Sequence, residues 1–452
     1  MQPQVSEGAF YRRDLQQPRL AAFARALRGS DADWPPTHWR AGDLFVAALY
    51  FRYKLAAQRA DLRAARAGVM TAGRTPPLGI NLTFEHDSHP DESGASPWSF
   101  GAILDFLIPG PGQREARIAA AEARAQVARA RLGTTTWTLR EQVFRRYLEL
   151  QRLHRQLRLS DRARKLLTEA AGMLARRGEL GMVGAPTVSN MRLRLQRARL
   201  TWATVHADLT TARIALADAI GVPAAALAKI PDPTAPGTSE LPQPPALTAM
   251  RRRALTGRYD IHSALAEYAL ADAELRAAVA EQYPDITLSP GILFDQGDAV
   301  WLLNLSWLFV LPGHHDGPII AARARRGAAA ARFRGLQTRV IGAVAQALAQ
   351  YQGRLDVLTT ARNVLAAQHK VQTQVSARVD AGYTGRLALL TTQLETLSAR
   401  RARVDAWSRA RVALTNLETQ VQTGLGQNAS ADELVTRFVA GAGAGRKNGT
   451  GP

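Results

Sequence analysis

The chain has 452 residues, no cysteine and a mean hydropathy of −0.17, and its 58 Lys and Arg exceed its 38 Asp and Glu to give a net charge of +20. The lack of cysteine excludes disulfide scaffolds, cysteine zinc sites, thiol nucleophiles and cysteine lipidation. No run of about 18 uninterrupted apolar residues occurs, which excludes a polytopic helical membrane protein. Glycine-rich phosphate loops, nucleophile elbows and HExxH sequences are also missing, so we predict neither an enzyme nor a cofactor.

The basic charge raises nucleic acid as a candidate partner, but the distribution of the cations argues against it. Only five of the 58 cations are Lys, and the Arg residues are spread along Ala-rich segments beside Glu, Asp and Gln. Phosphate recognition concentrates charge on one face or arm, so we predict no nucleic-acid partner. Residues 1–7 lack the charged and apolar regions of a secretory signal, which leaves either a cytoplasmic protein or a chain whose true start is missing.

In chain order, the sequence divides into an N-terminal extension, two repeats separated by a linker, and a tail. The extension, 1–41, is expected to be partly disordered, whereas the linker is rich in Pro and the tail in Gly. The other expected ranges are 42–221 for the first repeat, 222–245 for the linker, 246–426 for the second repeat and 427–452 for the tail.

A hydrophobic period of two predicts two strands in each repeat. The predicted ranges are about 78–85 and 98–108 in the first repeat, and about 286–294 and 301–311 in the second. An apolar face with aromatic residues near its ends is typical of a membrane barrel strand, and an ordinary half-buried sheet is the alternative. The aromatic residues that we expect to face lipid or its interface are Trp98, Phe100, Phe106, Trp301, Trp307 and Phe309.

These strands belong to an internal repeat. Residues 98–110 reappear as 301–313 at an offset of 203, and both copies begin with Trp and end with Pro-Gly. Each copy follows another alternating run and precedes a long helical segment. The sequence therefore predicts a mainly α fold with a small β part, built from duplicated helix–strand–strand–helix repeats.

The helical segments are unusually long. From Pro111 to about Arg177, and again from Pro318 to about Ala381, glycine is scarce and no further proline occurs, so each helix reaches roughly 90–100 Å at 1.5 Å per residue. Apolar residues at alternating spacings of four and three, such as Val344, Leu348 and Tyr351, predict coiled-coil seams. Glycine-containing breaks at about 178–186 and 381–386 predict hairpin tips.

The sequence resembles the TolC-type outer-membrane efflux proteins in three features. These are the two repeats, the strands that end in Pro-Gly before Ala-rich helices, and the two glycine-centred tips. Segments 43–49 and 60–68 are most similar to the heavy-metal and cation-efflux branch of that family. The resemblance covers about residues 42–426 and implies a homotrimer in the outer membrane of a Gram-negative bacterium. Each protomer would give four strands to one twelve-stranded barrel in outer-membrane lipid, and its long helices would form a tunnel across the periplasm.

The resemblance also implies partners. In the family, the tips meet a periplasmic adaptor protein or an inner-membrane pump, here expected to be of the RND type. The matching tip residues are Gly181, Met182, Val183, Gly184, Gly382, Tyr383, Thr384, Gly385 and Arg386. Some members carry carboxylates just after the second tip that select cations. Ala388 and Thr391 occupy those positions here, a departure that argues against an acidic selectivity ring.

Four histidines are the candidate metal ligands. His86 and His89 lie in the loop between the first two strands, and His314 and His315 follow the second Pro-Gly. A polar loop and a helix N-terminal cap explain them without a metal, so we expect no resident metal. The alternative to a channel is a soluble periplasmic coiled-coil adaptor, against which the lipid-patterned strands argue.

Overall fold

The computed structural model describes residues 3–29, 33–86, 88, 96–230, 240–295, 298–307, 316–425 and 430–442. The chain forms two compact units, and each long helix contributes to both. The sheet unit consists of Ala57–Leu132 and Tyr259–Thr338. The helical unit consists of Met1–Ala56, Gly133–Arg258 and Arg339–Pro452.

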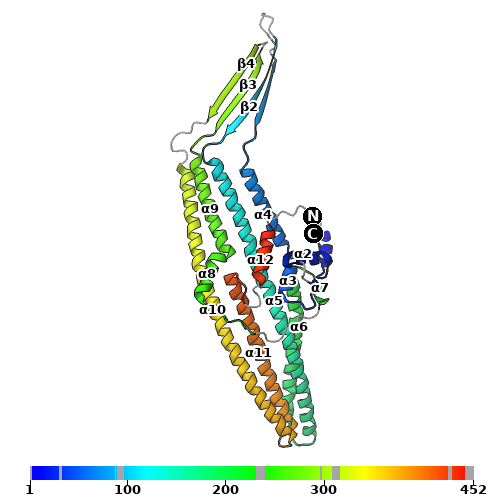
Figure 1. Cartoon of the computed structure of the whole chain (residues 1–452). Helices are drawn as coiled ribbons and strands as arrows, with labels where there is room; N and C mark the ends of the chain where they lie inside the picture. Colours follow the sequence, from blue (N-terminus) through cyan, green and yellow to red (C-terminus); the bar gives the residue numbers. More distant parts are fainter. Residues whose placement is uncertain are drawn as a thin grey trace. The chain divides into compact units, whose positions relative to one another are not determined.

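The sheet unit holds four antiparallel strands in the order β1-β2-β3-β4 (Figure 1). The strands are β1 (Gly79–His86), β2 (Trp98–Ile108), β3 (Ile286–Asp295) and β4 (Asp298–Trp307). The second predicted strand therefore has its expected bounds, and the first and third differ from theirs by one residue. The fourth begins three residues before the expected position, and the expected residues 308–311 lie outside the described part of the chain.

Helices adjoin this sheet in the sheet unit: α4 (Tyr53–Ala72), α9 (Tyr259–Ala280) and the beginnings of α5 (Gln113–Glu179) and α10 (Asp316–Asp380). Helix α9 contacts both long helices. It pairs with α5 through Arg124 and Glu274, 3.3 Å apart, and with α10 through Arg326 and Asp272, 3.1 Å apart. Small Ala side chains at the α9–α10 contact let the helices approach closely around Ile319.

The helical unit contains two antiparallel helix pairs. The rest of α5 pairs with α6 (Ala185–Ile220), and the rest of α10 pairs with α11 (Arg386–Val421). Shorter helices surround them: α1 (Pro3–Tyr11), α2 (Pro18–Arg28), α3 (Ala41–Phe51), α7 (Ala224–Ala228), α8 (Leu247–Gly257) and α12 (Ser430–Gly441). The predicted fold class, mainly helical with a small sheet, is confirmed.

Apolar seams hold the long helices together as the heptad spacing predicts. Val344, Tyr351 and Leu358 of α10 are buried, as are Val143 and Leu150 of α5. Tyr147 of α5 is buried as well, and its hydroxyl donates to the Trp39 carbonyl at 3.1 Å. None of the helices in the described part of the chain combines the length and apolar character that a membrane-spanning helix needs.

One ion pair is buried within this helical unit. The Arg140 Nη2 atom lies 2.8 Å from the Glu418 Oε2 atom, and both side chains are 0% exposed. The guanidinium also lies over the Phe144 ring, 4.3 Å from its centroid. The other Glu418 oxygen accepts the Leu425 backbone N–H at 2.9 Å, so this pair connects α5 to the end of α11.

The structure describes folded helices within the N-terminal extension, 1–41, which was expected to be partly disordered. Helices α1 and α2 occupy it, and Leu15, Leu20 and Leu27 are buried because α2 packs against α3 and α12. The expected tail at 427–452 likewise contains a folded helix, α12. Its Phe438 is only 3% exposed and contacts the Phe23 ring of α2.

Candidate functional site

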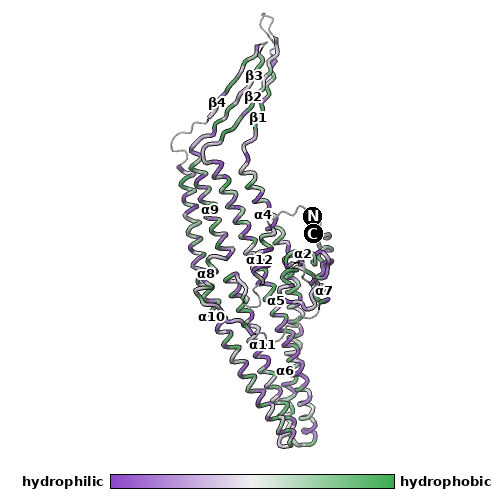
Figure 2. Tube along the Cα trace, in the orientation of Figure 1, coloured by the Kyte–Doolittle hydropathy of each residue, from purple (hydrophilic) through white to green (hydrophobic). Residues whose placement is uncertain are grey.

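The register of the sheet places the aromatic and most of the aliphatic side chains of its strands on one face. Ile80 of β1 lies opposite Leu104 of β2, Phe100 of β2 opposite Phe294 of β3, and Ile292 of β3 opposite Trp301 of β4. Since alternate residues point to one side, these pairs define a continuous apolar face. Figure 2 shows the hydrophobic residues recurring along the strands. The apolar face consists of Ile80, Leu82, Phe84, Trp98, Phe100, Leu104, Phe106, Ile108, Ile286, Leu288, Ile292, Phe294, Trp301, Leu303, Leu305 and Trp307.

Most of this apolar face is open to the surroundings within the described chain. Trp301 is 81% exposed, and Phe84, Leu303 and Trp307 are also exposed. An exposed apolar patch of this kind marks a surface that meets lipid or a partner. Of the six aromatic residues predicted on such a face, Trp98, Phe100, Phe106, Trp301 and Trp307 share it. Phe309 lies outside the described residues.

The opposite face of the sheet carries a polar network. The Asp105 carboxylate accepts hydrogen bonds from Asn81 Nδ2 and from Ser289 Oγ, both at 2.5 Å. Ser99 Oγ donates to Asp295 at 2.5 Å. The sheet therefore has one face that is mainly apolar and one that carries paired polar groups.

The two outer strands leave one backbone edge each without a partner in the described chain. In the strand order, β1 contacts only β2 and β4 contacts only β3. An open edge exposes unpaired N–H and C=O groups and invites pairing with another chain. An exposed apolar face next to two open edges is therefore an incomplete surface.

A tight junction connects β2 to α5. The Gly110 N–H donates to Asp285 Oδ1 at 2.9 Å, and Gln113 Nε2 donates to the Tyr283 carbonyl at 3.0 Å. A Cβ on Gly110 would clash with that same carbonyl oxygen. The Pro-Gly that the repeat revealed is thus required by close backbone packing.

The two predicted tips have the same geometry in the helical unit. In the first, the Met182 N–H donates to the Arg177 carbonyl at 2.8 Å, and in the second the Tyr383 N–H donates to the Arg378 carbonyl at 2.8 Å. Gly181 and Gly382 precede the two donors and adopt φ of +69° and +78°, which glycine tolerates best. The structure thus places the predicted tip residues in two equivalent turns.

The tips expose apolar side chains and carry one link between the helix pairs. Met182 and Tyr383 are exposed, the latter by 80%. Arg386 Nε at the start of α11 lies 3.0 Å from Glu169 Oε1 on α5. The Thr391 hydroxyl donates to the Leu387 carbonyl of its own helix at 3.0 Å. Val183, Gly184, Thr384 and Gly385 complete the two turns, and Ala388 lies one helical turn before Thr392 on α11.

Exposed apolar residues also form two stripes at heptad spacing on the long helices. The α6 stripe is Leu193, Leu200 and Ile214, and the α10 stripe is Val357, Val364 and Val371. Residues seven apart lie on one side of a helix, and apolar residues repeated in this way form the seam of a coiled coil. We define these two sets as the helix stripes. The sequence analysis did not single them out, although their spacing of seven is visible in the sequence.

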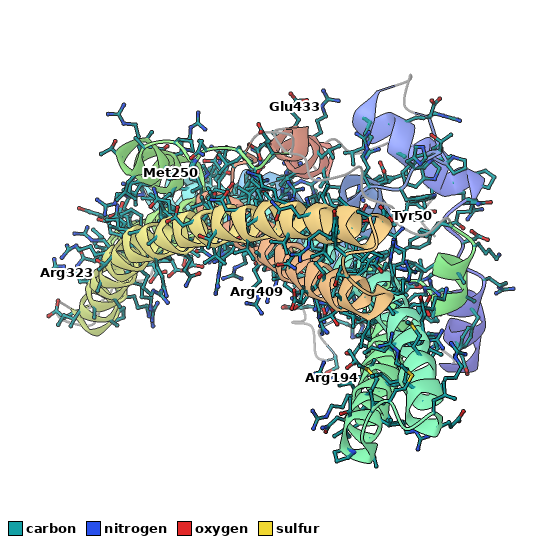
Figure 3. The ribbon with its side chains drawn as sticks, turned by 90° about the horizontal axis from the view of Figure 1, so that it is seen from below. Tyr50, Arg194, Met250, Arg323, Arg409 and Glu433 are labelled. Carbon is teal, nitrogen blue, oxygen red and sulfur yellow. The ribbon has the colours of Figure 1, made fainter. Side chains whose placement is uncertain are left out.

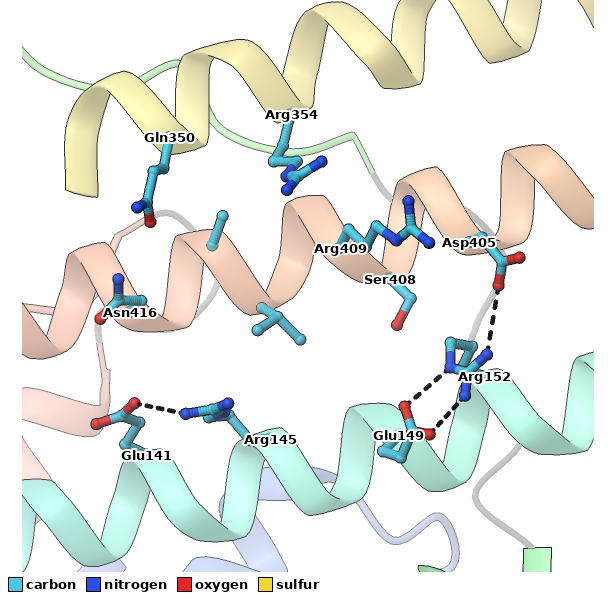
Figure 4. Close-up of a pocket in the computed structure, with 12 residues that line it drawn as sticks. Glu141, Arg145, Glu149, Arg152, Gln350, Arg354, Asp405, Ser408, Arg409 and Asn416 are labelled. Atoms are coloured by element: carbon cyan, nitrogen blue, oxygen red, sulfur yellow. Dashed lines mark hydrogen bonds and ion pairs between the residues drawn. The ribbon is translucent and has the colours of Figure 1, made fainter. Parts of the chain in front are cut away.

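A cavity of about 710 Å³ lies between α5, α10 and α11 in the helical unit. Its charged lining residues are Glu141, Arg145, Glu149, Arg152, Arg354, Asp405 and Arg409. Figure 4 shows the ion pairs that join Glu141 to Arg145, and Glu149 and Asp405 to Arg152. From the sequence, these Arg residues are expected to be scattered surface charges, and their convergence on one cavity was not predicted.

The candidate metal ligands are not brought together. The His86 ring contacts the Trp98 ring edge to face, with centroids 4.4 Å apart. His89, His314 and His315 lie outside the described residues. Within the described ranges, no three His, Asp or Glu side chains are grouped so that they could hold a metal ion.

The structure thus combines two strand pairs that share an exposed apolar face with two helical hairpins. Each hairpin has one helix of 67 or 65 residues and one of 36. Residues 44–222 and 250–421 match the family described as outer membrane efflux protein. The chain belongs to that family. None of the curated protein sequences matches this chain.

Solved structures share the fold at low sequence identity. The outer membrane protein VceC of Vibrio cholerae is 20% identical, with a TM-score of 0.69 over 85% of this chain and 97% of that one. A membrane protein of Pseudomonas aeruginosa is 22% identical, with a TM-score of 0.69 over 85% and 90%. The MtrE outer membrane channel of Neisseria gonorrhoeae is 19% identical, with a TM-score of 0.68 over 86% and 90%.

Proposed function

We propose that this chain is the passive outer-membrane channel of a tripartite efflux system in a Gram-negative bacterium. It exports small molecules or metal cations through a trimeric barrel and a periplasmic helical tunnel, and it performs no catalytic step. The observation that carries the proposal is the exposed apolar face on a sheet with two open edges. In a bilayer every backbone polar group must be paired, so such a sheet requires closure into a barrel.

Closure by three copies follows from the strand order. Four alternating strands leave β4 of one protomer antiparallel to β1 of the next, and twelve strands complete a ring without edges. The helix stripes support the same assembly, because one lies on α6 and the other on α10. Different patches on one protomer form heterologous contacts, and a rotation that closes makes a ring.

The tips are the proposed contact with an adaptor protein and an inner-membrane pump of the RND type. Met182 and Tyr383 offer exposed apolar groups at equivalent turns. Arg386 and Glu169 link the two helix pairs there, so opening of the tunnel end requires this contact to break. A soluble periplasmic adaptor is the alternative, and membership of the outer membrane efflux protein family argues against it. Segments 43–49 and 60–68 favour the cation-efflux branch of this family, whereas Ala388 and Thr391 argue against an acidic selectivity ring.

Two neighbouring residues of β4 test the proposal. Leu303→Arg places a charge on the apolar face, where an arginine near the bilayer centre costs about 2–4 kcal/mol. We expect this variant to lose trimer assembly in outer-membrane fractions and dye efflux in cells. Asn304→Arg, on the polar face, should keep both.

The matched pair separates a membrane wall from an ordinary sheet. If Leu303→Arg assembled in the outer membrane as well as Asn304→Arg, the apolar face would not contact lipid, and the proposal would fail. A protein that fractionated with the inner membrane or the soluble periplasm would contradict it equally.

A further inference from the structure

Two of the four arginines that line the cavity form no ion pair with its acidic residues. The three acidic side chains of the lining engage Arg145 and Arg152, with the closest atoms 2.5–3.5 Å apart. Arg354 of α10 and Arg409 of α11 have no acidic partner among the described residues. Figure 4 shows both guanidinium groups at the cavity with no bond to any other residue drawn. The four Arg of the lining exceed its three acidic side chains by one, and Arg354 and Arg409 are the two arginines without an acidic partner there.

Arg409, which lines the cavity, lies on the inner side of the angle between the two helix pairs. Seen from below, α10 and α11 meet α5 and α6 at an angle, and Arg409 and Arg194 lie on its inner side (Figure 3). Tyr50 and Glu433 lie on the outer side, together with the short helices that carry them. Because the short helices cover the outer side, we assign the open inner side of this angle to the tunnel of the proposed trimer.

The surrounding helices have the same sign of charge. Within the helical unit, the stretches 133–179, 185–220, 339–380 and 386–421 contain 27 Lys and Arg against 12 Asp and Glu. They supply most of the +20 net charge of the chain. Arg354 and Arg409 thus belong to helices whose charges sum to 27 − 12 = +15, an excess of positive charge.

We propose that the tunnel prefers anionic solutes, and that Arg354 and Arg409 form its charge-selective zone. This inference rests on the proposed channel function and narrows its cargo to small molecules with carboxylate or phosphate groups. Three protomers bring six such guanidinium groups to one level of the tunnel. Rings of Arg or Lys select anions in pores, and walls of one sign raise the local concentration of counter-ions. Guanidinium groups also bind carboxylate and phosphate through paired hydrogen bonds.

The test is the zero-current potential of the full-length channel in a planar lipid bilayer. The salt gradient is about tenfold in KCl and stays at or below about 0.1 M, where the screening length is about 10 Å or more. We expect the unaltered channel to be more permeable to chloride than to potassium. The double variant Arg354→Glu, Arg409→Glu should lower the chloride-to-potassium permeability ratio by about threefold or more. Charged walls enrich counter-ions by about tenfold or more, and salt screens part of that effect.

The matched control reverses two exposed charges on the outer side. Arg19→Glu in α2 with Arg252→Glu in α8 changes the net charge by the same amount and should leave the ratio unchanged. Gel filtration and circular dichroism check that both double variants assemble. If the reversed pair does not, Arg354→Gln with Arg409→Gln removes the charges and should lower the ratio in the same direction.

A second readout uses multivalent probes. Inorganic tripolyphosphate should reduce the conductance of the unaltered channel at concentrations at which spermine does not, and the charge-reversed variant should lose this block. A channel that conducts but prefers potassium, or whose preference survives charge reversal, would overturn the inference and leave the proposed function standing. A purified trimer that carries no ion current would overturn the channel function and this inference with it.

Discussion

The buried Arg140–Glu418 pair gives a prediction whose size follows from its surroundings. Glu418→Gln keeps the shape of the side chain and an oxygen that accepts the Leu425 N–H, but it removes the negative charge. Arg140 is 0% exposed, and its Nε and Nη1 atoms already lack hydrogen-bond partners among the described residues. An uncompensated buried charge costs about 3–5 kcal/mol. For a unit of this size, we expect a fall of about 6–10 °C in the unfolding temperature.

The assay is thermal unfolding followed by far-ultraviolet circular dichroism, on both single variants and the double variant. The double variant Arg140→Met, Glu418→Gln also removes the buried positive charge of Arg140. We therefore expect it to be more stable than Glu418→Gln alone. Replacing both partners of a buried pair is often neutral, whereas breaking it is strongly destabilising. If the two single effects simply added, the residues would not be coupled, and the reasoning from burial would be refuted.

Three further predictions follow from the structure. Leu200→Arg or Val364→Arg, in the helix stripes, should lower the trimer fraction in light scattering, because a charge would enter an apolar contact. Burial raises the pKa of Asp432 to about 6, so its stabilising contribution is present below about pH 3.8 and is lost as the pH rises through 6. Melting curves at about pH 4 and 7.5 should differ less for Asp432→Asn than for the unaltered chain. Gly110→Ala should cost about 1–3 kcal/mol by overpacking against the Tyr283 carbonyl, and Gly68→Ala, with open space in α4, should stabilise slightly.

Each of these three predictions has an outcome that would contradict it. Asn363→Arg, exposed beside the α10 stripe, is the control for the trimer fraction, and an equal loss in it would remove that stripe from the interface. An unchanged pH dependence in Asp432→Asn would mean that another group titrates in this range. Equal stability of the two Gly→Ala variants would show that the β2–α5 junction tolerates a Cβ.

The sheet was predictable because its signal is local. Alternation along β2 and β4 assigns each side chain to a face, and the 203-residue offset shows that two strand pairs exist. The register then follows from pairing apolar residue with apolar residue, as in Ile292 opposite Trp301. A shift by one residue would move every apolar side chain to the other face.

The N-terminal and C-terminal helices were missed although their spacing was visible. Leu20, Ala24 and Leu27 recur at helical intervals and are all buried in α2. Their burial depends on α12, some four hundred residues away, whose Arg437 donates to the Leu27 carbonyl at 3.3 Å. A prediction based on local composition sees a short segment without a core, because the partner that buries it is distant in sequence.

The charged cavity could not be predicted for a similar reason. Arg354 and Arg409 are two among many arginines on Ala-rich helices, and nothing in their immediate sequence separates them from Arg152, which is paired. Only the packing of α5 against α10 and α11 decides which arginines face an acid and which do not. The tips were easier, since glycine at positive φ marks the turns directly.

The most direct test of the account uses the absence of cysteine in the chain. A cysteine at Asn81 in β1 is combined in turn with one at Leu302, Asn304 or Ser306 in β4, which covers three registers of the polar face. The protein is oxidised in outer-membrane fractions and separated without reducing agent. The account predicts dimer and trimer bands in at least one register that revert to monomer on reduction. Monomer alone in all three registers would contradict a barrel closed by neighbouring protomers.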